Sequence, residues 1–504
     1  MNRFVKALKS ASQKSEAAAI GLIVAVSSAT SFWGLKTWSI NYEEALSLYL
    51  SNAPLAVALR CDIHPPIFYG WTKIVGLVTR SLWAHRFACA FFAFLLPPLV
   101  YTTARRWGRK KALFASIATA FSPLRVWSAH YLRPYALLPF LALLAFRFFS
   151  HFLETKRKTP LIFVWLFLTM ALLTHATALV IFPAFMGIIP LLPRRLRGPS
   201  VAALLGALAP FAIFTVLLTK DAPPTVRNTS LIGGILGFLF GATEPFAALS
   251  TISRPSSWWG LEFCLSQVVA LGLLWSIWKA LSKGKLSEKI VAGSVISSAF
   301  GIAIAGGLGF IHPLGRYTIV SLPFYFLALS LPVLAGPANK IGRSFLKIVP
   351  WLTIGLELVC LSHSLEFSFH FADYRGLVKE LQTKARPKAV VVFDTPELAL
   401  VFRLYLSPER YKFLPSAEVW NTRKGYFMGL LGRPFSKLEA GRYIEREIGK
   451  CSEVWAIIHP RRLWPNILEG KGFEEVYRKE AAGFMSKVVL CLYRKKEERC
   501  GAQD

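Results

Sequence analysis

An acidic pair, Glu43 and Glu44, is the first feature of the sequence that could carry out chemistry. Positions 1–365 contain only ten Asp or Glu residues, and three of them, Glu43, Glu44 and Asp62, fall within twenty residues. A carboxylate can remove a proton from an attacking hydroxyl group. The pair also fits a helix capping box, because Asn41 and Glu44 have its spacing, although capping would not explain Glu43. We favour the catalytic interpretation and keep the capping interpretation open.

A second segment, Cys61 to Trp71, places Asp62 and His64 directly before Pro65 and Pro66. The two prolines are expected to begin a helix. In an extended run, residues two apart point the same way, so Asp62 and His64 could share a divalent metal ion or a phosphate-linked proton. Alternatively, Asp62 caps the helix and His64 is solvated. The residue types therefore admit a metal without requiring one.

The rest of the chain determines where these residues can lie. Of its 504 residues, 54% are hydrophobic and only 17% are charged, and the mean hydropathy is +0.45. The net charge is +31, but the basic residues form short clusters between apolar runs instead of covering one surface. This distribution excludes an ordinary soluble enzyme and argues against a nucleic-acid partner. It is typical of a multi-pass membrane protein in contact with membrane lipids.

About eleven apolar stretches are long enough to cross a bilayer. Basic clusters between them all fall on the side of the N-terminus, which the positive-inside rule makes cytoplasmic. An odd number of spans then puts the C-terminus outside. The predicted spans lie near 17–38, 86–104, 112–128, 135–153, 160–176, 177–192, 200–219, 262–280, 289–310, 317–336 and 346–365.

The composition changes after residue 365, which separates a transmembrane domain, 1–365, from a domain over 366–504. Buried strands are predicted over 388–394, 453–459 and 486–493, with helices over 373–385 and 438–449. A small extracytoplasmic α/β domain of this length can have its own core. Its cysteines at 451 and 491 could form a disulfide if their geometry allowed it.

The acidic pair and the segment Asp62-Ile-His-Pro-Pro66 together resemble the first-loop signature of a family of membrane enzymes. These are the C-type glycosyltransferases similar to protein O-mannosyltransferases and aminoarabinose transferases, which usually carry Asp-Glu and then Asp-x-His-Pro-Pro. Glu43 stands where the family has Asp, so the base is either Glu43 or Glu44. Weaker resemblances follow at Arg86-Phe-Ala88, Ser128 to Tyr135, Thr174-His175, Gly315-Arg316-Tyr317 and Asp373-Tyr-Arg-Gly376.

The resemblance implies a polytopic α-helical fold of the C-type glycosyltransferases, called GT-C. It also implies transfer of a sugar from a polyprenyl phosphate to a hydroxyl acceptor at the outer membrane face, with inversion at the anomeric carbon. The acceptor could be a glycan, a lipid or a protein. Asp62 and His64 would position the acceptor, a metal or the leaving phosphate.

The lipid phosphate needs positive charge at the outer face, and arginine has a fork that suits phosphate oxygens. We expect Arg125 to snorkel towards water instead. His175, at a helix end, also fits a buried core histidine. The expected donor-binding residues are Arg86, Arg133, Tyr135, His175, Arg316 and Tyr317.

Two other classes of function remain open from the sequence. A transporter or lipid-glycan flippase would show inverted repeats and ionisable groups at mid-membrane. A catalytically inactive protein that binds lipid-linked glycans would explain the departure at Glu43. The enzyme is favoured because no convincing repeat is visible and the acidic cluster lies in a loop.

Overall fold

A computed structural model describes the chain in two compact units. The first contains the described residues of 1–36, 64–220 and 224–366, and the second those of 37–63 and 367–504. The described residues are 2–36, 40, 42–52, 65–219, 259–307, 319–331, 340–363, 373–393, 396–407, 409–414, 446–458, 468–482 and 487–495.

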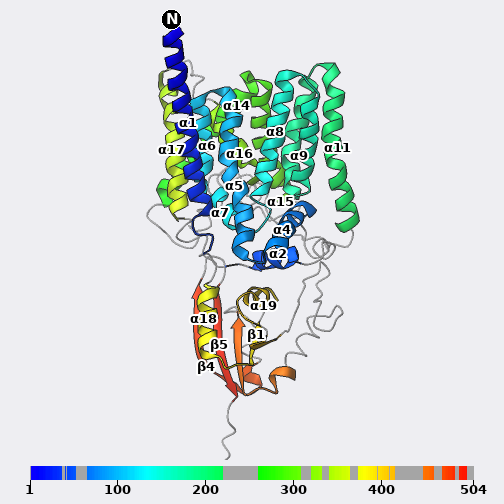
Figure 1. Ribbon diagram of the computed structural model, residues 1–504, viewed down its shortest axis with the longest axis vertical. Coiled ribbons are helices and arrows are strands. Elements are labelled where there is room, and N and C mark those ends of the chain that lie inside the picture. Colours follow the sequence, from blue (N-terminus) through cyan, green and yellow to red (C-terminus); the bar gives the residue numbers. More distant parts are fainter. Residues whose placement is uncertain are drawn as a thin grey trace, which may run out of the picture. The chain divides into compact units, whose positions relative to one another are not determined.

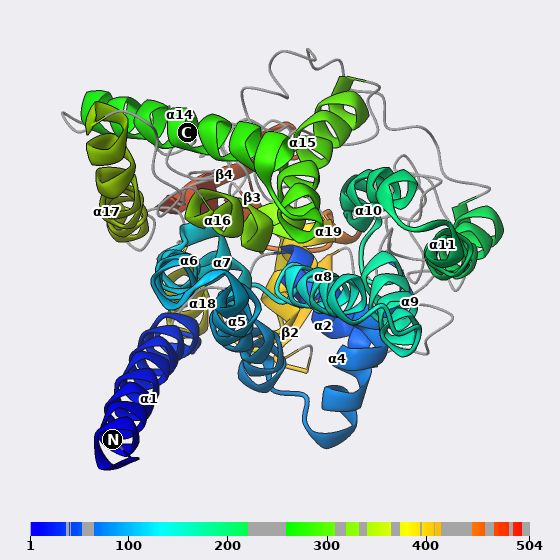
Figure 2. The same cartoon turned by 90° about the horizontal axis from the view of Figure 1, so that it is seen from above.

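The first unit is a helical bundle. One row of helices packs in the order α1, α5, α8, α9 and α11, and these stand side by side in Figure 1. Seen from above, α16 lies between this row and the pair α14 and α15 (Figure 2). The elements are α1 (Asn2–Phe32), α4 (Pro66–Val78), α5 (Leu82–Ala104), η1 (Arg105–Trp107), α6 (Arg109–Phe121), α7 (Pro123–His130), α8 (Leu137–Thr155), α9 (Thr159–Leu172), η2 (Ala176–Ile181), α10 (Phe182–Ile188), η3 (Ile189–Leu191), α11 (Arg194–Thr219), α14 (Trp259–Lys283), α15 (Leu286–Gly307), α16 (Leu322–Ser330) and α17 (Lys340–His363).

Four helices in the described part of the chain are long and apolar enough to cross a membrane. Shorter apolar helices cover 159–172, 176–191, 319–330 and 348–362. Eleven spans therefore stay a prediction, although a polytopic helical architecture is evident. The four long apolar segments are Ser15–Phe32, Leu82–Trp107, Leu137–Thr155 and Arg194–Thr215.

The predicted span over 112–128 is not one continuous helix, because the structure divides it into α6 and α7 at Ser122. Pro123 begins α7, and a residue before proline is disfavoured in the helical region. Ser122 accordingly has φ −57° and ψ 123°, outside the helical region. At Ser122, the proline that follows thus ends a buried helix inside an apolar run.

Two prolines, Pro97 and Pro98, lie inside α5. Neither has an N–H group, so the carbonyls of Ala93 and Phe94, four residues earlier, lose their helical donors. Ser27 Oγ of α1 donates to Phe94 O at 2.7 Å, and the Arg125 guanidinium donates to Ala93 O at 3.2 Å. Both freed carbonyls are therefore satisfied from neighbouring helices.

Arg125 is fully buried, so the expectation that it snorkels towards water is wrong. Its guanidinium also donates to Ser31 Oγ of α1 and to Ala120 O of α6, each at 2.6 Å, and to Thr30 Oγ1. Ala120 O lies in the last turn of α6, where carbonyls have no helical donor. One side chain of α7 thus bonds to α1, α5 and α6.

The second unit contains a mixed sheet in the order β2-β1-β3-β5-β4, in which β1 runs parallel to β2 and β3. The strands β5 and β4 are antiparallel to their neighbours. Helix α18 contacts β4 (Figure 1). Its elements are α2 (Tyr42–Asn52), α18 (Tyr374–Lys384), β1 (Ala389–Phe393), α19 (Pro396–Arg403), β2 (Tyr411–Leu414), β3 (Glu453–Ile458), β4 (Phe473–Ala482) and β5 (Lys487–Lys495).

The three predicted strands are confirmed as β1, β3 and β5, and the predicted helix over 373–385 is confirmed as α18. The edge strand β4 is not predicted by the sequence pattern, because charged residues occupy much of it and hide the buried positions. The predicted helix over 438–449 lies mostly outside the described residues.

Cys451 and Cys491 are free thiols, so the suggested disulfide is wrong. Cys491 lies opposite Ala456 in the β3–β5 ladder, five positions beyond Cys451. Cys451 lies two residues before β3, and five residues of extended chain span roughly 16 Å, whereas disulfide-linked Cα atoms lie about 4.4–6.8 Å apart. The strand register therefore keeps the two thiols apart.

Replacing Arg125 by Met should destabilise the bundle by about 2–5 kcal/mol, because several buried acceptors would lose their donor. Replacing it by Lys should cost less, since an ammonium group keeps some of these bonds. Thermal unfolding of the detergent-solubilised protein measures both effects. Arg147→Met is the control, because Arg147 donates to one exposed partner, Thr102 Oγ1, at 2.6 Å. Equal stability of the Arg125 and Arg147 variants would contradict this prediction.

The second unit should lose stability in acid through Glu380. Hydrogen bonds from Lys479, Tyr477 and Lys384 lower the pKa of Glu380 to about 2. A lowered carboxyl pKa stabilises the fold above the ordinary pKa near 4.5, and this stabilisation is lost as the pH falls from there towards 2. We expect hydrogen-exchange protection of α18 and β4 to fall over that range. Glu380→Gln should lower protection at pH 6 and flatten its pH dependence, and an unchanged profile would exclude this role.

Candidate active site

The acidic pair lies in the first turn of α2, an eleven-residue helix of the second unit. Negative charge is favourable there, because the first turn carries the positive end of the helix dipole. Glu43 is half-buried, whereas Glu44 is only 1% exposed. The two carboxylates of the predicted site therefore differ in their access to a substrate.

Four predicted site residues, Asp62, His64, Arg316 and Tyr317, lie outside the described residues. Within the described part of the chain, no three His, Cys, Asp or Glu residues are grouped so that they could hold a metal ion. A divalent metal at Asp62 and His64 therefore stays a prediction.

Arg86 and His130 bind the chain that follows α1. Arg86 lies in the first turns of α5, is 1% exposed, and donates from Nη1 to Leu35 O at 3.2 Å. His130, the last residue of α7, places Nε2 2.5 Å from Trp33 O. His130 Nδ1 lies 2.8 Å from Val126 O in the preceding turn of α7. These contacts gather basic side chains at one end of the bundle.

Arg133 and Tyr135 occupy the short irregular connection between α7 and α8. Pro134 disfavours a helical conformation at Arg133, so α7 does not continue into α8. The Arg133 N–H donates to Tyr131 O at 2.7 Å in a tight turn. Both predicted residues are buried, with 7% of Arg133 and 2% of Tyr135 exposed.

Aromatic rings connect this segment to His175. Trp127, Tyr131 and Tyr135 contact one another, with ring centroids 4.5–6.0 Å apart. The Tyr135 ring lies 5.6 Å from the imidazole of His175, which caps η2 by accepting from Thr177 N at 3.1 Å. The structure therefore brings Tyr135 and His175 together, and it gives His175 a structural role as a cap.

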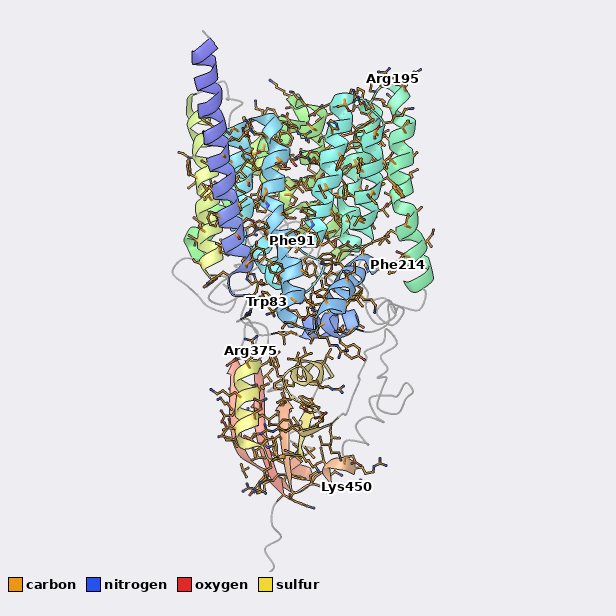
Figure 3. The ribbon with its side chains drawn as sticks, in the orientation of Figure 1. Trp83, Phe91, Arg195, Phe214, Arg375 and Lys450 are labelled. Atoms are coloured by element: carbon orange, nitrogen blue, oxygen red, sulfur yellow. The ribbon has the colours of Figure 1, made fainter. Side chains whose placement is uncertain are left out.

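The opposite end of the bundle has a different character. Arg105 pairs with Glu16 at 2.8 Å, and Arg106 pairs with Glu154 at 3.0 Å, both partly exposed. Figure 3 shows Arg195 of α11 at this end, while Trp83 of α5 marks the other end. Buried basic and aromatic groups at one end thus contrast with exposed ion pairs at the other.

The described site residues form two sets. Arg86, Arg133, Tyr135 and His175 belong to the first unit, and Glu43 and Glu44 belong to the second. Trp127, His130 and Tyr131 are not among the site residues predicted from the sequence. Of the rings at 127, 131 and 135, only Trp127 lies in a helix, so helical periodicity does not predict their contact.

Comparison with known proteins identifies the fold. No family model and no curated protein matches the sequence. Among solved structures, apo ArnT from Cupriavidus metallidurans superimposes with a TM-score of 0.61 and 13% identity, over 95% of this chain and 98% of ArnT. ArnT bound to undecaprenyl phosphate gives 0.60 and 14%, over 94% and 97% of the two chains. The mycobacterial arabinofuranosyltransferase AftD gives 0.48 and 12%, over 95% of this chain and 40% of AftD.

The match to ArnT extends through both units of the chain. At 13% identity, this likeness shows the fold. It confirms the fold that the first-loop resemblance implied. The chain has the GT-C fold.

Proposed function

We propose that this protein is a membrane glycosyltransferase that moves a sugar from a polyprenyl phosphate to a hydroxyl acceptor. The observation that carries the proposal is the GT-C fold over 95% of the chain, combined with the first-loop motifs. A structure with this fold, that of ArnT, contains undecaprenyl phosphate, and a lipid-linked donor fits the motifs of this chain. The acceptor is a glycan, a lipid or a protein hydroxyl.

The base in this proposal is Glu43. A base must reach the acceptor hydroxyl, and Glu43 is half-buried whereas Glu44 is 1% exposed. Glu43 removes the hydroxyl proton while the acceptor oxygen bonds to the anomeric carbon. The bond from that carbon to the phosphate oxygen breaks, and its electron pair leaves with the lipid phosphate. A single displacement of this kind inverts the anomeric configuration.

The leaving phosphate is bound by Arg86 and Arg133 in this proposal, together with Arg316. A phosphate beside a bilayer needs fixed positive charge, because few water molecules are available to solvate it. Arg86 and Arg133 lie at the end of the bundle that also holds Tyr135 and His175. In this proposal, the rings of Tyr135, His175 and Tyr317 provide apolar surface for the lipid next to the charged arginines.

Membrane topology follows from the same proposal. The chain crosses the cell membrane about eleven times, with a cytoplasmic N-terminus and an extracytoplasmic domain over 366–504. The ion pairs of Arg105 and Arg106 with Glu16 and Glu154 lie at the end of the bundle where the basic loops gather, as the positive-inside rule expects. The site then faces the outer side, where Asp62 and His64 position the acceptor or the phosphate.

Glu43→Gln should lower turnover about 10²–10⁴-fold, because the amide cannot accept the hydroxyl proton. Donor binding should persist, since the base contacts the acceptor. The assay incubates purified protein with a panel of polyprenyl-phosphate sugars and measures released polyprenyl phosphate. Glu44→Gln on the same helix is the matched comparison and should have the smaller effect. Wild-type turnover in both variants would move the base elsewhere.

Arg86→Ala and Arg133→Ala should weaken donor binding by about 2–5 kcal/mol, because each removes a charge that neutralises the phosphate. Lysine at either position keeps the charge but loses the fork, so a partial loss is expected. Binding of a polyprenyl-phosphate sugar to the folded variants measures this. Arg106→Ala, at the opposite end of the bundle, should bind as wild type does. The phosphate site is wrong if both arginine variants retain wild-type affinity.

A further inference from the structure

Helix α2 packs on a helix that lies more than 340 residues later in the chain. It contacts α19, and both helices belong to the second unit. The chain two residues before α2 also contacts the second unit, because the N–H of the buried Ile40 donates to Tyr405 Oη at 3.4 Å. The acidic pair is therefore attached to the C-terminal domain.

An isolated helix of eleven residues is not stable in water, because nucleation costs more than so few hydrogen bonds return. Helix α2 must therefore gain its stability and its direction from packing. Contact with α19 supplies packing from within the second unit. The direction of the Glu43 side chain then depends on what holds α19.

Helix α19 is firmly held. It follows β1, which lies between β2 and β3 in the sheet. Phe402 of α19 contacts Phe393 of β1 and Tyr374 of α18, with ring centroids 5.8 and 5.7 Å apart. Four of its side chains are at most 3% exposed, namely Leu398, Ala399, Val401 and Phe402.

The backbone of Tyr405 also contacts α18. Gln382 Nε2 of α18 donates to Tyr405 O at 3.5 Å, and Arg410 Nη2 donates to Gln382 O at 3.2 Å. The phenol group that accepts from Ile40 therefore sits on a backbone anchored to α18.

We propose that the C-terminal domain acts as the positioning element for the catalytic base, with α19 as the support of α2 and Tyr405 as a positioning residue. The inference rests on the proposed function, because it assumes that Glu43 is the base. A base displaced by about 1 Å can lose roughly 10²-fold in rate, so a rigid support for a short acidic helix has a large effect on turnover. The domain thus contributes to the reaction through the placement of α2.

Tyr405→Phe removes the acceptor of the Ile40 N–H and keeps the ring. We expect kcat to fall about tenfold while the Kd for a polyprenyl-phosphate sugar stays the same, because only the orientation of the base changes. Tyr405→Ala should lower kcat further. In the full-length protein, hydrogen exchange of the α2 amides should rise in both variants, with β1 and β3 unchanged.

Tyr493→Phe is the matched control, because it removes a tyrosine hydroxyl from the same domain that bonds instead to Glu475 of β4 at 3.1 Å. It should raise exchange in β4 and leave α2 and kcat as in the wild type. The inference is overturned if α2 exchange is unchanged in both Tyr405 variants, or if Tyr493→Phe lowers kcat equally. An inactive wild type would instead refute the proposed function, and the exchange measurement would still decide whether α19 supports α2.

Discussion

The helical bundle depends on the satisfaction of backbone carbonyls that proline and helix ends leave without a donor. A bilayer offers no water to replace a lost hydrogen bond, so each such carbonyl needs a partner inside the protein. The Arg125 guanidinium meets this need for Ala93 and Ala120 and also bonds to Ser31 and Thr30. The end of α1 is thereby joined to α5, α6 and α7, and the loss of one residue would affect four helices.

The connection between α7 and α8 is irregular, and the candidate donor site includes two of its residues. Pro123 and Pro134 interrupt what would otherwise be continuous helix, so Arg133 and Tyr135 lie on a tight connection between α7 and α8. Buried basic groups inside a membrane protein are costly and are usually functional. Arg125 is a buried arginine that stabilises the fold through its hydrogen bonds to α1, α5 and α6. Arg86 and Arg133 are the arginines that we assign to the phosphate.

Helix α2, which carries the acidic pair, has only eleven residues and is not stable in isolation. Its support comes from α19, and α19 is in turn held through Phe402 by Phe393 and Tyr374. In our proposal, a domain without a recognisable catalytic motif influences catalysis by holding the helix that carries Glu43. Under this proposal, the C-terminal domain takes part in the reaction by supporting α2.

Composition and local pattern determined the helical membrane architecture, the strands β1, β3 and β5, and the GT-C resemblance, because hydropathy and short motifs are properties of neighbouring residues. They did not reveal the break at Ser122, the charged edge strand β4 or the separation of Cys451 from Cys491, which depend on proline geometry, strand order and register. Sequence alone could not show that Arg125 is buried, since an arginine beside an apolar run can equally snorkel towards water. Only the tertiary structure decided that Arg125 bonds to carbonyls freed in other helices and that α2 packs on α19, because both facts join residues that are far apart in the chain.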